Sequence, residues 1–252
     1  MEIAGNDIEI YAYSDLLMGA TAYGIAHAES TWTWSYANQQ PTDDLNVHDN
    51  RIECVFNDVS TNLVQGIYIN ESNNTVISNN IIKNVTVDGL TVFDYRKTNV
   101  TIVENLIDGF GTCPGDSFGT HPGDPSERHG VHTLFESILW RGDISRNIIR
   151  YETQTARPNN AIGINVWGSG TKNLSIIDND VSPTCWLHEL VTVIPANSNV
   201  RIEAYGTAAP SYGAHTIGNI YWNTNPSAGG PAFWMTTTGG KPGIMTPCNL
   251  ST

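Results

Sequence analysis

The sequence predicts an all-β protein, a right-handed parallel β-helix of about seven coils, and three observations predict it. A short phrase with a central asparagine recurs along the 252 residues. β-branched residues stand at fixed offsets on both sides of that asparagine. A glycine followed by an aliphatic residue comes after most copies. Such repetition is typical of solenoids, in which each repeat forms one coil.

The recurring phrase is clearest in residues 74 to 109, where N-x-x-I-x-x-N-x-I occurs twice, 25 residues apart. Other copies bring the number of centres to seven, with intervals of 44, 30, 25, 42, 32 and 40 residues. The centres are Asn6, Asn50, Asn80, Asn105, Asn147, Asn179 and, in a degraded copy, Asn219. Most intervals fall within the range of about 20 to 50 residues that indicates a solenoid or array.

Each copy predicts a strand, a corner and a second strand. The position three residues before each centre is occupied by Ile3, Val47, Ile77, Ile102, Ile144, Ile176 and Thr216 in turn. The position two residues after each centre is occupied by Ile8, Ile52, Ile82, Ile107, Ile149, Val181 and Tyr221. Short β-branched segments punctuated by Asn, Asp and Gly are typical of strands and turns. We expect each asparagine at the corner, because Asn tolerates left-handed backbone geometry and can bond turn backbone. The stacked side chains are expected to form a hydrogen-bonded ladder.

A glycine opens the next predicted strand of each coil, at Gly24-Ile25, Gly66-Ile67, Gly89-Leu90, Gly130-Val131 and Gly163-Ile164. For the last four, the interval to the next central asparagine is 14, 16, 17 and 16 residues, whereas the interval from asparagine to glycine varies from 9 to 25. One side of each coil is therefore fixed and the other accepts insertions, as expected for stacked parallel strands with loops at particular corners.

With its turn asparagines and N-x-I and G-I coils, the chain resembles the pectate-lyase-like β-helix superfamily over residues 1 to 222. The resemblance implies a β-helix at 1–222, and we expect residues 223–252 to form a C-terminal capping tail. The superfamily includes polysaccharide lyases, glycoside hydrolases, uronate epimerases, phage tailspikes and adhesins, and fold alone does not choose among them. RHGVH loosely matches the G-H-G element of polygalacturonases. Their N-T-D and paired-Asp motifs, and the clustered Asp and R-x-x-R of pectate lyases, are missing.

The charge and composition of the chain favour some classes of binding partner over others. Twelve Lys and Arg against 25 Asp and Glu give a net charge of −13, which disfavours nucleic acid and anionic membranes. Neutral glycans are favoured over acidic ones, which would need a basic patch or a bridging cation. Because the chain begins within a coil, we expect a longer protein, an additional N-terminal domain or a partner at that end. Cys54 is expected to be a buried thiol, and Cys113 and Cys185 are candidates for a disulfide.

The strand after each glycine is expected to carry an exposed strip suited to sugars, which present apolar C–H faces and hydroxyl edges. The outward positions two and four residues beyond the glycines are Ala26, Tyr68, Thr91, His132 and Asn165, and Ala28, Asn70, Phe93, Leu134 and Trp167. Of these, Tyr68, Phe93, Asn165 and Trp167 are candidate substrate-binding residues.

Carboxylates on neighbouring coils are the first candidates for catalysis. If Glu71 and Asp94 are adjacent, their carboxyl groups can approach about 5 Å, close to the spacing of a retaining glycosidase pair. The same pair could bind Ca²⁺ with Asn70 adding a carbonyl. Arg96 and Lys97 could neutralise Asp94, or act in a lyase as base and carboxylate clamp. A solvated charge cluster is the alternative, and no other metal or cofactor is indicated.

Histidines at the end of the longest predicted loop are the second candidates. The loop and its end span Phe110 to His132 and finish with Arg128, His129 and His132 near the strip. Asp88 holds the position of His129 in the preceding coil, so an Asp–His contact could set the histidine tautomer and raise its basicity. A histidine that only satisfies a turn is the alternative.

Two functions are consistent with these features. One is a polysaccharide lyase or glycoside hydrolase acting on an extracellular glycan. The other is a noncatalytic glycan-binding or structural segment of a phage tailspike or adhesin, for which a homo-oligomer would bury the outward aromatic residues. Either function places the protein outside the cell or on a cell or virion surface.

Overall fold

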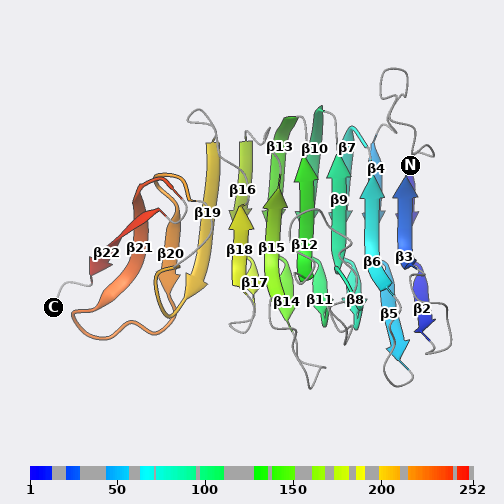
Figure 1. Ribbon diagram of the computed structural model, residues 1–252, viewed down its shortest axis with the longest axis horizontal. Helices are drawn as coiled ribbons and strands as arrows, with labels where there is room; N and C mark the ends of the chain where they lie inside the picture. The colour runs from blue at the N-terminus through cyan, green and yellow to red at the C-terminus, as the bar shows by residue number, and fades with distance from the viewer. Residues whose placement is uncertain are drawn as a thin grey trace.

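The computed structural model describes residues 1–12, 21–28, 44–56, 63–70, 72–94, 97–110, 128–135, 138–150, 161–167, 173–181, 186–190, 199–210, 215–240 and 243–249. Every regular element in these ranges is a β-strand. The strands stack side by side along the long axis of the molecule, from the N-terminal to the C-terminal end (Figure 1). This confirms the predicted all-β parallel β-helix.

Three sheets run the length of the stack, and successive strands along the chain pass from one sheet to the next. We call them sheets A, B and C. Sheet A begins with seven parallel strands, β1 (Glu2–Ala4), β4 (Leu45–His48), β7 (Asn74–Ser78), β10 (Lys97–Val103), β13 (Ile138–Ser145), β16 (Asn173–Ile177) and β19 (Asn199–Gly206). Sheet B contains β2 (Asp7–Ala12), β5 (Arg51–Phe56), β8 (Ile81–Lys83), β11 (Leu106–Asp108), β14 (Ile148–Arg150) and β17 (Asp180–Val181). Sheet C contains β3 (Thr21–Ala28), β6 (Leu63–Asn70), β9 (Leu90–Asp94), β12 (Arg128–Phe135), β15 (Ala161–Trp167) and β18 (Trp186–Leu190).

The described residues therefore form six three-stranded coils, and β19 begins a seventh. The core lies between the sheets and is built from the β-branched residues that flank the central asparagines. Ile77 pairs with Val47 and Ile102 along sheet A, and all three side chains have 0% exposure. Sheet B contributes Ile52, Ile82, Ile107 and Ile149, and sheet C contributes Ile67, Leu90, Val131 and Ile164, each at most 1% exposed.

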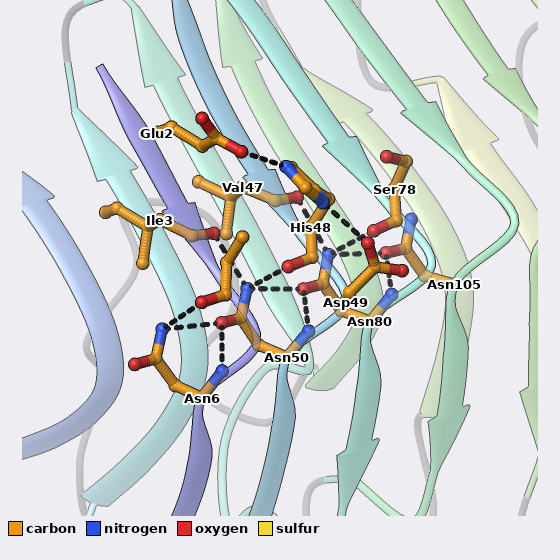
Figure 2. Close-up of polar contacts among 11 residues, drawn as sticks. Glu2, Ile3, Asn6, Val47, His48, Asp49, Asn50, Ser78, Asn80 and Asn105 are labelled. Carbon is orange, nitrogen blue, oxygen red and sulfur yellow. Dashed lines mark hydrogen bonds and ion pairs between the residues drawn. The ribbon is translucent and has the colours of Figure 1, made fainter.

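The asparagines form the predicted ladder at the corner between sheets A and B (Figure 2). The Nδ2 of each donates to the Oδ1 of the next from Asn6 through Asn50, Asn80, Asn105 and Asn147 to Asn179, over 2.8 to 3.0 Å. The same Oδ1 atoms accept the backbone N–H of the preceding ladder asparagine at 3.0 to 3.1 Å. These bonds satisfy polar groups that the coil stack removes from water.

The left-handed residue of each corner is not the asparagine, as the sequence suggested, but the residue before it. Gly5, Asp49, Asn79, Glu104, Arg146 and Asp178 have φ between 54° and 69°. A long charged side chain can occupy this position because it points to solvent at the corner, where Glu104 and Arg146 are exposed and form an ion pair at 2.8 Å. The ladder amide, rather than asparagine's own backbone preference, therefore explains why asparagine recurs.

The seventh centre, Asn219, does not belong to the ladder. Ile176 pairs with Ile202, but β19 continues without a corner to Gly206. Asn219 keeps the local turn, since Gly218 before it has a φ of 90°, and its Oδ1 accepts from the backbone N–H of Ile202 at 3.0 Å. The prediction of seven ladder members is wrong at this position, because a local phrase can persist where coil stacking has ended.

Glycine recurs at the start of the sheet C segments because the core leaves no room for a side chain there. A Cβ on Gly89 would lie 2.5 Å from Cγ2 of Ile107 and 2.7 Å from the carbonyl oxygen of Gly130. A Cβ on Gly130 would lie 2.5 Å from Cγ2 of Ile149 and 2.7 Å from the carbonyl oxygen of Gly163. Each of these glycines thus lies against the isoleucine two residues after the next ladder asparagine.

The C-terminal part extends sheet A by one more parallel strand and then by two antiparallel pairings. After β19 come β20 (Ile220–Asn223), which pairs with it in parallel, and then β21 (Pro231–Thr238) and β22 (Ile244–Asn249), which pair antiparallel. Tyr221 is buried, with its hydroxyl 2.8 Å from Nδ1 of buried His215, and Trp234 and Met245 pack against the core. The sequence predicted a capping tail from residue 223.

Cys54 is a buried free thiol, as predicted, with 1% exposure, and burial raises its pKa to about 12. Cys113 and Cys185 lie outside the described residues.

Candidate functional site

The predicted strip lies on the outer face of sheet C, and its register is as expected. Ala26 pairs with Tyr68, Tyr68 with Thr91, Thr91 with His132, and His132 with Asn165. The second row, Ala28, Asn70, Phe93, Leu134 and Trp167, is also in register across the coils. The regular glycine-to-asparagine interval is therefore a reliable guide to alignment on this sheet.

Exposure along the strip differs from the prediction. Thr91 is 0% exposed and Asn165 is 3% exposed, so the expectation that Asn165 is open to a ligand is wrong. Strand alternation fixes the face on which a side chain lies, but it does not determine whether other chain segments cover that face. Thr133, on the opposite face of β12, donates to the backbone oxygen of Asn165 at 3.4 Å.

Three aromatic side chains stack across the first three coils of sheet C. The ring centroids of Tyr23 and Tyr68 are 5.1 Å apart at 45°, and those of Tyr68 and Phe93 are 5.6 Å apart at 85°. Tyr68 and Phe93 are half-buried, whereas Tyr23 is 40% exposed. Partial burial raises the pKa of Tyr23, which keeps its hydroxyl protonated. We call Tyr23, Tyr68 and Phe93 the sheet C stack.

Sequence reasoning missed Tyr23. Tyr23 stands immediately before Gly24, outside the two outward rows. On the next coil, Gln65 is in register with Tyr23, and Tyr68 is in register with Ala26. The small side chain of Ala26 leaves space that an aromatic ring of the same coil can occupy. A reading of the positions that precede the glycines, in addition to those that follow them, could have found it.

Two amide oxygens flank the sheet C stack. Gln65, in register with Tyr23, is 6% exposed, and Asn70, in register with Phe93, is half-buried. Within the described part of the chain, Oε1 of Gln65 and Oδ1 of Asn70 accept no hydrogen bond. Both oxygens are hidden from solvent, as Oδ1 of Asn165 is, so a ligand hydroxyl could reach them only if the side chains turned outward. Aromatic faces suit a polyhydroxylated ligand.

Asp88 is fully buried in the segment that leads into β9. Its Oδ2 accepts from Oγ1 of Thr91 at 3.2 Å, and its backbone oxygen accepts from the N–H of Gly66 at 3.1 Å. These contacts hold Asp88 beneath the strip, next to the stack rather than within it.

The other candidate side chains belong to parts that the structure does not describe. The backbones of Asp94 on β9, Lys97 on β10, Arg128, His129 and His132 on β12, and Trp167 on β15 are placed in strands, without a description of their side chains. Glu71 and Arg96 lie outside the described residues. The predicted Glu71–Asp94 pair, the Asp88–His129 contact and the Ca²⁺ alternative therefore stay predictions.

Within the described residues, no group of three or more His, Cys, Asp or Glu side chains could hold a metal ion. The same residues include no helix long and apolar enough to cross a membrane. Comparisons with protein-family models, curated protein sequences and solved structures found no match.

Proposed function

We propose that this protein binds an extracellular glycan along the outer face of sheet C. The observation that carries the proposal is the sheet C stack, in which three aromatic rings lie side by side and Tyr23 is 40% exposed. The aromatic rings would contact the C–H faces of successive sugars. With a net charge of −13, a neutral glycan meets less repulsion than an acidic one.

Cleavage of the bound glycan is the second candidate function, as a polysaccharide lyase or a glycoside hydrolase of the pectate-lyase-like kind. It is favoured by the position of Asp94, which directly follows Phe93 and pairs in register with Phe135 on the next coil. Asp94 is also one of the two carboxylates that the sequence predicts as a catalytic pair. The alternative is a noncatalytic tailspike or adhesin segment.

Binding can be tested by affinity electrophoresis of the purified chain in gels containing soluble neutral or uronic polysaccharides. We expect Tyr68→Ala to weaken binding about tenfold, because it removes the central ring of the stack. Tyr11→Ala is the matched control, since Tyr11 is an exposed tyrosine on sheet B, with 52% exposure. Equal mobility of the Tyr68→Ala variant and the wild-type chain, with folding intact, would refute the proposed site.

Cleavage is tested on any polysaccharide that binds, by following new reducing ends and unsaturated-product absorbance with and without Ca²⁺. Activity that Asp94→Asn or His129→Ala abolishes, without loss of binding, would establish an enzyme. Binding without product would support the noncatalytic alternative.

A further inference from the structure

A second aromatic surface lies at the C-terminal end of sheet A. Tyr205 on β19 pairs in register with Trp222 on β20, and Trp222 pairs with Phe233 on β21. The rings of Trp222 and Phe233 have centroids 5.1 Å apart at 52°. Tyr205 is 47% exposed and Trp222 is 38% exposed. We call Tyr205, Trp222 and Phe233 the C-terminal platform.

Strand alternation explains why these rings face outward. The residues beside them, Tyr221 on β20 and Trp234 on β21, pair with each other on the opposite face and contact the core. Tyr221 is only 2% exposed. Because the buried face is already filled with large rings, the platform is an additional aromatic surface that core formation does not require.

Polar groups border the platform. Arg201 and Glu203, on the same strand as Tyr205, form an ion pair, so the local charge is balanced. Further along β21 and β22, beyond exposed Met235, the hydroxyl groups of exposed Thr237 and Thr246 are 2.9 Å apart. The surface thus combines aromatic faces with hydrogen-bonding groups at its edge, without a net charge from the ion pair.

The size of the platform indicates what kind of ligand fits. An aromatic side chain presents about 150–250 Å² in all, so the exposed fractions of Tyr205 and Trp222 leave on the order of 200 Å² open. A stable protein partner needs about 800 Å² on each side, so it would have to contact surface well beyond these two rings. The net charge of −13 disfavours nucleic acid and anionic lipid. A short stretch of uncharged sugar matches the area, the ring faces and the polar border.

We propose that the C-terminal platform is a second glycan-binding site, separate from sheet C, which holds a neutral polysaccharide by stacking sugar rings on Tyr205 and Trp222. The site does not depend on the sheet C stack, because the two surfaces lie on different sheets. In a chain that binds at both places, the two sites would anchor one polymer and raise its overall affinity.

The test measures binding of the full chain to soluble xylan, mixed-linkage β-glucan and galactomannan by affinity electrophoresis and titration calorimetry. Trp222→Thr removes the ring and keeps a residue that favours strands, and Tyr205→Thr does the same at the more exposed position. Ile217→Thr is the control, since Ile217 is 73% exposed and does not belong to the platform. Thermal unfolding followed by circular dichroism shows that each variant is folded.

We expect Trp222→Thr and Tyr205→Thr each to weaken binding to at least one polymer by about tenfold, and Ile217→Thr to leave it unchanged. The platform proposal is wrong if the folded platform variants, Tyr205→Thr at the least, bind the polymers like the wild-type chain. This holds even if Tyr68→Ala abolishes binding. If the platform variants lose polysaccharide binding and Tyr68→Ala binds normally, the result would support the platform and refute the sheet C site. Failure of the wild-type chain to bind any of the three polysaccharides would overturn the platform proposal.

Discussion

Truncation of one buried ladder asparagine should destabilise the whole coil stack. The side chain of Asn105 has five hydrogen-bonding contacts. The two N–H groups of Nδ2 serve three acceptors, Oδ1 of Asn147 at 3.0 Å and the backbone oxygens of Ile77 at 3.0 Å and Val103 at 3.1 Å, so one N–H is shared. Oδ1 accepts from N and Nδ2 of Asn80 at 3.1 and 2.9 Å. Asn105 is 1% exposed, so water cannot replace these partners without rearrangement.

The magnitude follows from the groups that Asn105→Ala would leave without a partner. The backbone N–H of Asn80 loses its acceptor and the oxygen of Ile77 loses a donor, while Nδ2 of Asn80 keeps bonds to Val47 and Ser78. One unsatisfied buried N–H costs about 1–3 kcal/mol and the other lost bonds add about 1 kcal/mol, which gives about 3 kcal/mol of lost stability.

Asn6→Ala is the internal control. Asn6 is exposed at the first corner, and its side chain donates to Ala4 and Asn50. Its loss should cost about 1 kcal/mol or less. Urea unfolding of both variants, followed by far-UV circular dichroism, measures the difference in unfolding free energy. Equal costs for Asn105→Ala and Asn6→Ala would refute the view that the ladder stabilises the stack through its buried bonds.

Three further predictions test the corner, the core and the first coils. Gly89→Ala should lose about 1–3 kcal/mol or fail to fold, because its Cβ would overlap Ile107 and the Gly130 carbonyl. Gly5→Asn should be nearly neutral in the same unfolding assay, since Asn79 adopts a left-handed φ of 55° at the equivalent corner, against 69° for Gly5. Hydrogen bonds of His48 to Asp49 at 2.7 Å and Glu2 at 2.9 Å raise the pKa of His48 (Figure 2), so the stabilisation is complete below its unfolded value of about 6.5 and is lost as pH rises through the folded value. His48→Gln should therefore destabilise the protein more at about pH 5.5 than at about pH 8.5, and the same cost at both would contradict this. Cys54, with a pKa of about 12, should resist iodoacetamide at about pH 8 until urea unfolds the chain, as peptide mass spectrometry would show; rapid native labelling would show that the site opens.

The repeated phrase predicted much of the fold because one short pattern encodes a local corner and a buried pair of neighbours. Ile77, Asn80 and Ile82 occupy the positions that their spacing implied, and the same holds for the equivalent residues of the adjacent coils. The glycine interval likewise predicted the alignment of sheet C. The corner phrase and the glycine interval recur in successive coils, so a misaligned copy can be recognised by comparison with the other copies.

Features that depend on a single coil could not be predicted in this way. Tyr23 joins the sheet C stack because Ala26 is small and Tyr68 is its neighbour on the next coil, a coincidence that occurs once. The platform of Tyr205 and Trp222 depends on β19 continuing where earlier coils turn. No repeated signal marks either feature.

The sequence by itself determined the β-helix, the ladder corner and the glycine column, because these follow from side-chain size, hydrogen-bonding groups and spacing within each coil. Only the tertiary structure decided which outward residues are accessible, such as exposed Tyr23 and buried Asn165, and where the ladder ends before Asn219. Exposure and termination depend on contacts between segments far apart in the chain, and a local pattern contains no information about them.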